Sequence, residues 1–296
     1  MGASQWSPLI PRGPHSVTAD PWLREVPQSH HGVLGPALSQ LTHGSMRFPS
    51  VTRVSLDLPW VPDPRHGISP TDGIVLLPQP HGTSAALEIA LLDKVSSGCA
   101  GVIQLLEWLQ LPDSFVLVLE HLERCQDLSG FLVERGFLLE EEVQGLLLQV
   151  LEAVRRCPSC GVLHRDIKPG NILLDLATGQ LTLINFGCGT FLQDTAYTQF
   201  AGTLSYSPPE WIHQQRYHGE AATIWSLGLL LHHLVMGKHP FRRGQEISGV
   251  RSCSQDECQD VIKRCLSMEP LDRPSLEEIF RDPWIHVHSW IQGAGR

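Results

Sequence analysis

A short run of charged and amide residues between two apolar segments constrains the fold of this chain more than any other feature. It reads His-Arg-Asp-Ile-Lys-Pro-Gly-Asn over residues 164–171. Within it, Asp166 can orient a hydroxyl group and accept its proton, Lys168 can neutralise a phosphoryl oxygen, and Asn171 can offer a carbonyl oxygen to a divalent cation. Transfer of a phosphoryl group needs these functions, because positioning and charge stabilisation do most of the catalytic work. The run predicts a phosphoryl-transfer site; alone, it also fits a polar turn between a helix and a strand.

Length, charge and hydropathy exclude several classes of protein. The 296 residues are 42% hydrophobic, enough for a substantial core in one large or two small domains. A formal charge of -9 argues against a nucleic-acid partner. No apolar run approaches the roughly 18 to 20 residues of a membrane helix, and the N-terminus has no signal-peptide pattern. We expect a cytoplasmic or nuclear monomer with no membrane or nucleic-acid partner, since the scattered cysteines fit a reducing compartment.

The first 80 residues differ from the rest of the chain in composition. Residues 1–50 are rich in Pro, Gly, Ser and His, which predicts a disordered or loosely packed segment. Residues 51–80 contain short strand-like pieces, but the prolines at 59, 62, 64, 70 and 78 interrupt them. Because proline removes a backbone donor from a β-ladder, we expect no long central strand there.

Beyond residue 83, apolar spacing predicts helices and strands in a defined order. The expected helices, the first with Ser84 as its N-cap, cover residues 84–95, 139–157, 222–236, 255–266 and 275–280. The expected strands cover residues 102–109, 115–119, 171–175 and 181–184, the last two forming a hairpin. The helix at 222–236 is apolar nearly all round and should be buried. The order predicts an α+β fold, with a small mixed N-terminal lobe, a larger helical C-terminal lobe and a ligand cleft between them.

Four motifs resemble those of eukaryotic protein kinases, and among these the PIM family of serine/threonine kinases. They are Gly-Val-Leu-His-Arg-Asp-Ile-Lys at 161–168, Tyr-Ser-Pro-Pro-Glu-Trp-Ile at 206–212, Arg-Tyr-His-Gly at 216–219 and Trp-Ser-Leu-Gly at 225–228. The resemblance extends over residues 81–284. It implies a two-lobed kinase fold, with a divergent N-lobe at 51–120, a C-lobe at 121–290 and a tail at 291–296.

The same resemblance implies a function and a set of site residues. The function is transfer of the ATP γ-phosphoryl group to serine or threonine of a protein, with ATP and Mg²⁺ as cofactors. The implied catalytic residues are Asp166 as base and Lys168 as its phosphate-side partner. The implied nucleotide-binding residues are Glu88 on a helix, Glu120 and Glu123 in the hinge, and Asp127 near the ribose. The implied metal ligands are Asn171 and Asn185, and Glu210 with Arg273 is implied as a structural ion pair.

The chain departs from the kinase pattern at the metal site. Where the family has Asp-Phe-Gly, this chain has Asn185-Phe186-Gly187. An amide oxygen can ligate a cation but brings no charge, and hard divalent cations prefer anionic oxygens. Loss of one charge-stabilising group typically costs about 2.7 to 4 kcal/mol, or about 10²- to 10³-fold in rate.

The groups that hold nucleotide phosphates are also missing. No Gly-x-Gly-x-x-Gly run precedes Glu88, and the four lysines, at 94, 168, 238 and 263, all follow it. Lys94 lies about 600° of helical rotation beyond Glu88 and should point away from it. Arg53 or Arg65 could substitute, but a guanidinium fork is not equivalent to a compact ammonium group.

The expected peptide groove is less acidic than the family pattern. Gly130 and Gly170 stand where the family has acidic residues, and residues 237–243 (Gly-Lys-His-Pro-Phe-Arg-Arg) add positive charge. Like charges repel, so an arginine-rich peptide should be disfavoured. A solvated surface loop without a partner explains the same residues equally well.

Three functional hypotheses follow. The first is a serine/threonine kinase whose activity is impaired by Asn185 and by the missing glycine loop and lysine. The second is a pseudokinase that acts as a protein-binding module or signalling scaffold, because fold-specifying residues do not imply activity. The third is a decaying gene copy or a mis-joined coding sequence whose N-terminal lobe folds poorly.

Overall fold

The computed structural model describes residues 51–52, 76–78, 84–98, 100–110, 115–136, 138–240 and 256–286. The expectations for residues 1–50 and 291–296, and for Arg53 and Arg65, lie outside this part of the chain. The side chains of residues 51–52, 76–78, 84, 85 and 256 are not described.

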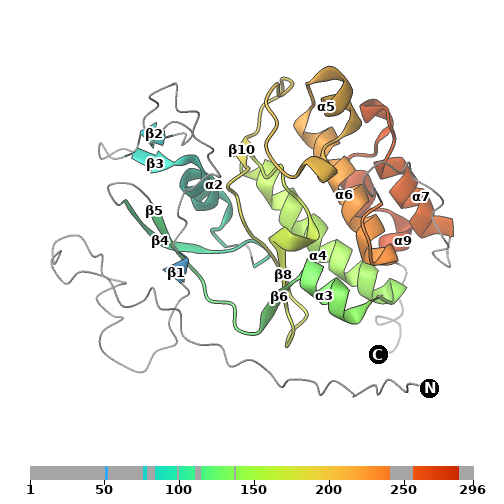
Figure 1. The fold of residues 1–296 in the computed structure, drawn as a ribbon, viewed down its shortest axis with the longest axis horizontal. Helices are drawn as coiled ribbons and strands as arrows, with labels where there is room; N and C mark the ends of the chain where they lie inside the picture. The colour runs from blue at the N-terminus through green and yellow to red at the C-terminus, as the bar shows by residue number, and fades with distance from the viewer. Residues whose placement is uncertain are drawn as a thin grey trace, which may run out of the picture. The chain divides into compact units, whose positions relative to one another are not determined.

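In the described residues, the N-terminal part combines two small antiparallel sheets with the helix α2 (Figure 1). The first sheet has the order β1-β5-β4, with β1 at Val51–Thr52, β5 at Phe115–Leu119 and β4 at Leu105–Gln110. The second pairs β2 (Leu76–Pro78) with β3 (Ser84–Ala86), and α2 (Leu87–Val95) follows directly. The prediction of a helix starting at Ser84 was therefore wrong. Ser84 pairs with Pro78 in a strand, so the helix begins only at Leu87.

The C-terminal part is mainly helical and is built around α4 and α6. The helices are α3 (Leu128–Arg135), α4 (Glu140–Ser159), α5 (Pro209–Gln214), α6 (Gly219–Met236), α7 (Asp256–Cys265), α8 (Leu276–Phe280) and α9 (Pro283–His286). Single 3-10 turns lie at η3 (Pro169–Asn171), η4 (Leu204–Tyr206) and η5 (Pro270–Asp272). An unbroken run from Ile224 to His232 is buried, which confirms the expectation that this helix is central.

Two further antiparallel sheets lie among the described residues of the C-terminal part. Strands β6 (Cys125–Asp127), β8 (Ile172–Asp175) and β9 (Leu181–Leu183) form one, with β8 and β9 as the predicted hairpin. Strands β7 (Val162–Leu163) and β10 (Thr190–Phe191) form the other. The predicted α+β fold, with a small, partly β N-terminal part and a larger, mainly helical C-terminal part, is confirmed.

Backbone hydrogen bonds join the N-terminal sheet region to the β8–β9 hairpin. The amide of Ile103 donates to the carbonyl of Leu183 at 3.0 Å, and the amide of Leu183 donates to the carbonyl of Gly101 at 2.8 Å. One hydrophobic cluster includes buried residues of α2, β5, α4, β9 and α6. None of the helices in the described part of the chain is long and apolar enough to cross a bilayer.

Glu210 of α5 forms a direct ion pair with Arg273, which follows η5. The two guanidinium NH groups of Arg273 donate to the two carboxylate oxygens of Glu210 at 2.9 and 2.7 Å. The side chains are only 1% and 5% exposed for Arg273 and Glu210, respectively. Arg273 also donates to the carbonyls of Ser267 and Ala221, so its guanidinium group has four hydrogen bonds.

Candidate functional site

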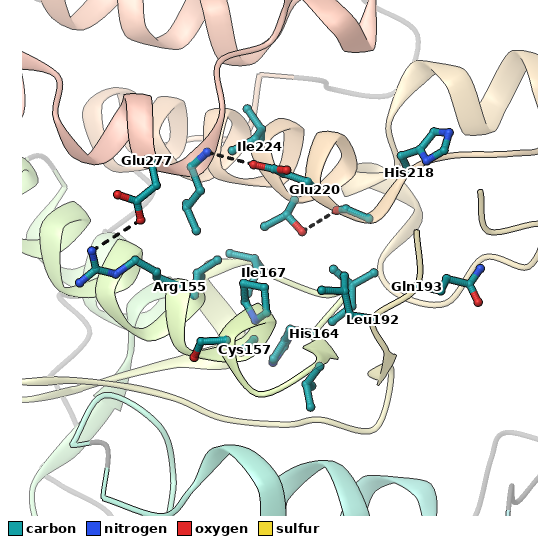
Figure 2. A pocket seen from close by; sticks show the side chains of 18 of the residues that line it. Arg155, Cys157, His164, Ile167, Leu192, Gln193, His218, Glu220, Ile224 and Glu277 are labelled. Carbon is teal, nitrogen blue, oxygen red and sulfur yellow. Dashed lines mark hydrogen bonds and ion pairs between the residues drawn. The ribbon is translucent and has the colours of Figure 1, made fainter. Parts of the chain in front are cut away.

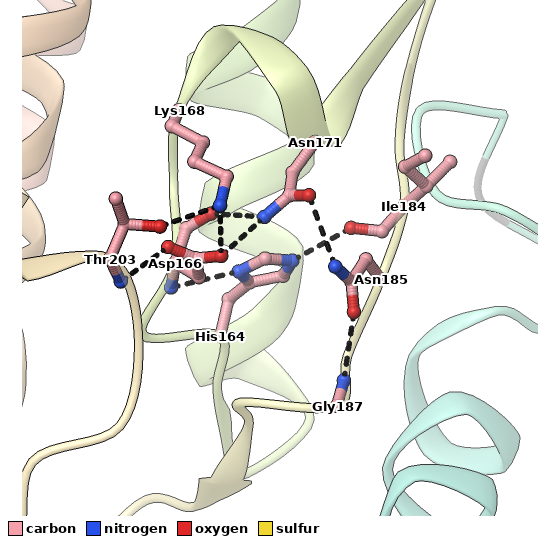
Figure 3. A network of polar contacts seen from close by, with 8 residues as sticks. All are labelled: His164, Asp166, Lys168, Asn171, Ile184, Asn185, Gly187 and Thr203. Carbon is pink, nitrogen blue, oxygen red and sulfur yellow. Dashed lines mark hydrogen bonds and ion pairs between the residues drawn. The ribbon is translucent and has the colours of Figure 1, made fainter. Parts of the chain in front are cut away.

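The candidate site is organised by the loop between β7 and β8. Pro169 begins the 3-10 turn η3, and the amide of Asn171 closes it by donating to the carbonyl of Lys168 at 3.0 Å. Arg165 takes a positive φ of 66°, which reverses the chain direction just before Asp166. The turn and the reversal bring Asp166, Lys168 and Asn171 onto one side of the loop (Figure 3).

Asp166 is 3% exposed and accepts hydrogen bonds at both carboxylate oxygens. Its Oδ2 accepts from Lys168 Nζ at 2.8 Å and from Asn171 Nδ2 at 2.7 Å, and its Oδ1 accepts from the amide of Thr203 at 2.9 Å. Burial alone would raise the pKa of this carboxyl group, but the three donors outweigh burial and lower the pKa below its usual value. Asp166 is therefore ionised at neutral pH and aligned, as a proton acceptor must be.

The two asparagines of the site are bonded to each other. The NH2 group of Asn171 donates to two oxygens of Asp166, the carbonyl at 2.8 Å and Oδ2 at 2.7 Å, so its own Oδ1 must face away from Asp166. That oxygen accepts from Nδ2 of Asn185 at 3.1 Å. The remaining oxygen of Asn185 accepts from the amide of Gly187 at 3.3 Å (Figure 3). Because Asp166 offers only acceptors and Gly187 only a donor, the orientation of both amides is fixed from both ends.

This arrangement fits a divalent cation poorly. The oxygen that Asn171 would present to a metal already accepts a hydrogen bond from Asn185, and neither amide carries a charge. Asp166 is the single carboxylate in this network, and Lys168 pairs with it. Magnesium prefers anionic oxygens in a strict octahedral geometry. Across the described residues, no group of three His, Cys, Asp or Glu side chains could hold a metal.

His164 supports the loop as a neutral side chain. The amide of Asp166 donates to its Nδ1 at 3.2 Å, so the ring proton is on Nε2, which donates to the carbonyl of Ile184 at 3.0 Å. Burial lowers the pKa of the imidazole from 6.5 to about 4, because a charged ring would lose its hydration. The ring also packs edge-on against Phe186, with centroids 4.7 Å apart.

We expect His164 to make the protein less stable in mild acid. Between pH 6.5 and about 4, the unfolded chain binds a proton at this histidine and the folded chain does not. The free energy of unfolding therefore falls as the pH falls, by about 3 kcal/mol in total. Urea unfolding of the His164→Gln variant should show a pH dependence smaller by about one proton over this range. The matched variant of the exposed His213, His213→Gln, should keep the wild-type dependence. Equal pH dependence in both variants would contradict this assignment.

A cavity of about 430 Å³ lies beside the Asn185 end of the network. Glu88 of α2, Glu120, His121 and Asn185 line it, and we call it the Glu88 cavity. Its other walls are apolar: Leu92, Ile103, Leu117, Leu119, Leu122, Leu173 and Ile184. Apolar walls with a few polar groups suit a flat heterocycle. The described lining contains two carboxylates and no lysine or arginine, so it offers nothing to neutralise a triphosphate.

Glu88 has no cationic partner within the described ranges. The amide of Phe186 donates to its carboxylate, yet burial raises its pKa above the usual value. The nearest lysine in sequence, Lys94, lies over the ring of Phe191 at 6.0 Å from the centroid, as its helical position predicts. The lysine expected on a preceding strand does not exist in the chain.

The remaining predicted nucleotide residues lie apart from this cavity's described lining. Glu123 is exposed, and its backbone carbonyl accepts a long hydrogen bond from the thiol of Cys125. Asp127 caps the N-terminus of α3, where its side chain accepts from the amide of Gly130 at 3.1 Å.

The sequence analysis assigned no site role to Thr203. Its hydroxyl group accepts a hydrogen bond from Lys168 at 2.5 Å, and its amide donates to Asp166. No spacing signal could have found it, since it lies 37 residues beyond Asp166.

Comparison with known proteins places these residues within a recognised domain. Residues 79–285 match the family described as Protein kinase domain. Serine/threonine-protein kinase pim-2 of Danio rerio is 43% identical over 217 residues, which cover 70% of each chain. Serine/threonine-protein kinase prk-2 of Caenorhabditis elegans is 37% identical over 213 residues, covering 69% of this chain and 48% of the relative. Testis-specific serine/threonine-protein kinase 5 of Mus musculus is 34% identical over 194 residues, covering 60% and 51%.

Proposed function

The chain belongs to the protein kinase family and is PIM-like within it, and from this premise we propose that it is a serine/threonine kinase domain whose phosphoryl transfer is strongly impaired. Its family uses ATP and Mg²⁺ and acts on protein substrates, and from these we carry ATP and a protein substrate to this chain as part of the proposal. The proposed location is cytoplasmic or nuclear.

The loop around Asp166 supports the kinase part of the proposal. Asp166 is ionised, buried and held by three donors, so it can orient a substrate hydroxyl group and accept its proton. Lys168 lies 2.8 Å from that carboxylate and is 27% exposed, so its ammonium group can also face an incoming phosphoryl oxygen. These two side chains retain the arrangement that proton transfer needs.

The hydrogen bond between Asn185 and Asn171 carries the impairment. Asn185 stands where the family has an aspartate, and its amide group donates to the Asn171 oxygen that a metal would use. A neutral amide pair cannot replace the charge that stabilises the metal and the phosphates. The side chains present do not fit a bound metal ion.

A second candidate function is a pseudokinase that binds a protein partner. The Glu88 cavity favours it, because two carboxylates line it and its described lining contains no lysine or arginine to hold phosphates. The buried pair of Glu210 and Arg273 meanwhile keeps the C-terminal framework ordered. Under this hypothesis the fold presents a surface and nucleotide binds weakly or not at all.

The Asp166→Asn variant tests the kinase proposal. We expect its transfer of radiolabelled phosphate from ATP to a generic protein substrate to fall by about 10²- to 10⁴-fold, down to background, because an amide cannot accept the proton. The control is Asp175→Asn in the β8–β9 turn, where the amide oxygen can still accept from Ala177 and activity should be unchanged. If wild type and Asp166→Asn transfer phosphate equally, Asp166 is not the base and the second candidate gains support.

A further inference from the structure

A second pocket, of about 540 Å³, lies on the C-terminal part of the chain (Figure 2). It is bounded by the last turns of α4, the strand β7, the first turns of α6 and the start of α8, and we call it the α4–α6 pocket. None of its described lining residues lines the Glu88 cavity. Its volume is in the range of sites for drug-sized molecules.

The walls of the α4–α6 pocket are effectively apolar. Val154, Val162, Ile167, Leu192, Ile224 and Leu276 supply hydrocarbon surface. Two polar side chains among the walls already have partners: both ring nitrogens of His164 are hydrogen-bonded, and the Thr223 hydroxyl donates to the carbonyl of Gly219 at 2.8 Å. A ligand against the walls near His164 and Thr223 would therefore meet hydrocarbon and satisfied polar atoms.

The charged residues of the pocket are exposed and have an acidic excess. Among the described lining residues, Asp194, Glu220 and Glu277 provide three carboxylates and Arg155 provides one guanidinium group, a formal excess of two negative charges among these four. Glu277 pairs with Arg155 at 3.6 Å and also with Arg281, outside the described lining, at 3.5 Å, so the unpaired acidic charge among the described residues lies at Asp194 and Glu220. Within the described residues, neither Asp194 nor Glu220 forms an ion pair. From the described residues, Glu220 accepts a single long hydrogen bond, 3.4 Å, from the amide of Leu276.

We propose that the α4–α6 pocket binds an organic amine, with an apolar ring body against the walls and a protonated amino group beside Glu220. Apolar walls favour burial of the body. The acidic excess favours a cation and disfavours an anionic ligand of the same shape, because like charges across a contact repel. The site adjoins the catalytic loop, since His164 and Ile167 line it and flank Asp166 in sequence.

Three probes with one body test the charge preference. They are 4-(4-phenylphenyl)butan-1-amine and the alcohol and carboxylic acid of the same biphenyl-butyl skeleton, titrated into the full chain by calorimetry. Exposed ion pairs contribute modestly, so we expect the amine to bind roughly threefold to tenfold more tightly than the alcohol. The acid should bind more weakly than the alcohol. Equal binding of all three, or no amine binding at millimolar concentration, would overturn the proposal.

Two variants locate the binding. Leu192→Trp replaces an isobutyl side chain of the pocket lining, 39% exposed, by a bulky indole ring, and should reduce amine affinity at least tenfold. Leu176→Trp is the matched control, because Leu176 is 53% exposed on the β8–β9 turn and is absent from the described pocket lining. Amine affinity that survives Leu192→Trp would place the ligand elsewhere and overturn the assignment.

Glu220→Gln separates charge from shape without a larger side chain. The amide oxygen can still accept from Leu276, so the start of α8 should stay in place. We expect the affinity of the amine to fall roughly twofold to fivefold and that of the alcohol to stay unchanged. An equal loss for both probes would show that shape, not charge, was disturbed, and would contradict the amine preference.

Discussion

Replacing Glu210 by glutamine is expected to lower the free energy of unfolding by about 3 to 5 kcal/mol. The carboxylate meets the guanidinium group of Arg273 through two hydrogen bonds, and both side chains are almost fully buried. Removing the negative charge leaves the guanidinium group buried beside Trp225 with only carbonyl oxygens as acceptors. An unpaired buried charge is far more costly than the pair itself is stabilising.

Thermal and urea unfolding of Glu210→Gln measure this loss. In a domain of this size the expected change corresponds to a decrease of about 10 °C in Tm. Glu277→Gln is the control, because Glu277 is 48% exposed and its contacts with Arg155 and Arg281 are long, 3.6 and 3.5 Å. That change should cost less than about 1 kcal/mol. Equal, small losses in both variants would show that the buried pair does not hold α5 to the C-terminal end of the chain.

Replacing Asn185 by aspartate is expected to raise metal-dependent phosphoryl transfer by about 10²- to 10³-fold. Aspartate restores the missing charge, and an ionised carboxylate cannot donate to Asn171, so the Asn171 oxygen becomes free. The contact with the amide of Gly187 can persist, because a carboxylate oxygen also accepts it. The carboxylate and the freed oxygen together are a set that a hard cation prefers.

The control for this gain is Asn185→Ala. It also removes the hydrogen bond to Asn171 but adds no charge, so we expect no increase in transfer. Rates measured with radiolabelled ATP, with and without Mg²⁺, compare the two variants with the wild type. A gain in both variants would mean that releasing Asn171 is sufficient. A gain in neither would mean that the missing lysine and glycine loop limit the rate on their own.

Local patterns predicted a large share of the fold. Apolar spacing located α4, α6 and the β8–β9 hairpin, because each buries a face whose period is visible in the sequence. The predicted start of α2 at Ser84 was wrong, because Ser84 pairs with Pro78 in a strand and this pairing overrides the local N-cap signal. Prolines before residue 80 predicted short strands, and β1 and β2 are two and three residues long.

The residues of the candidate site could be predicted from the sequence, but the hydrogen bonds between them could not. The motif around Asp166 pointed to the residues of the loop, because their spacing within one turn is short. The hydrogen bond between Asn185 and Asn171 depends on how two amides orient, which sequence does not reveal. The α4–α6 pocket was likewise invisible, because residues from Val154 to Glu277 meet only through tertiary packing.

A thermal-shift titration with ATP, with and without Mg²⁺, tests the central claim that the Asn185–Asn171 amide pair replaces a working metal site. A ligand that binds the folded state raises its stability by about 2.7 kcal/mol at a hundredfold excess over Kd. We predict that Mg²⁺ adds nothing to the effect of millimolar ATP on the wild type, and that it adds a clear rise in Asn185→Asp. A metal-dependent rise in the wild type as large as that in Asn185→Asp would contradict the account.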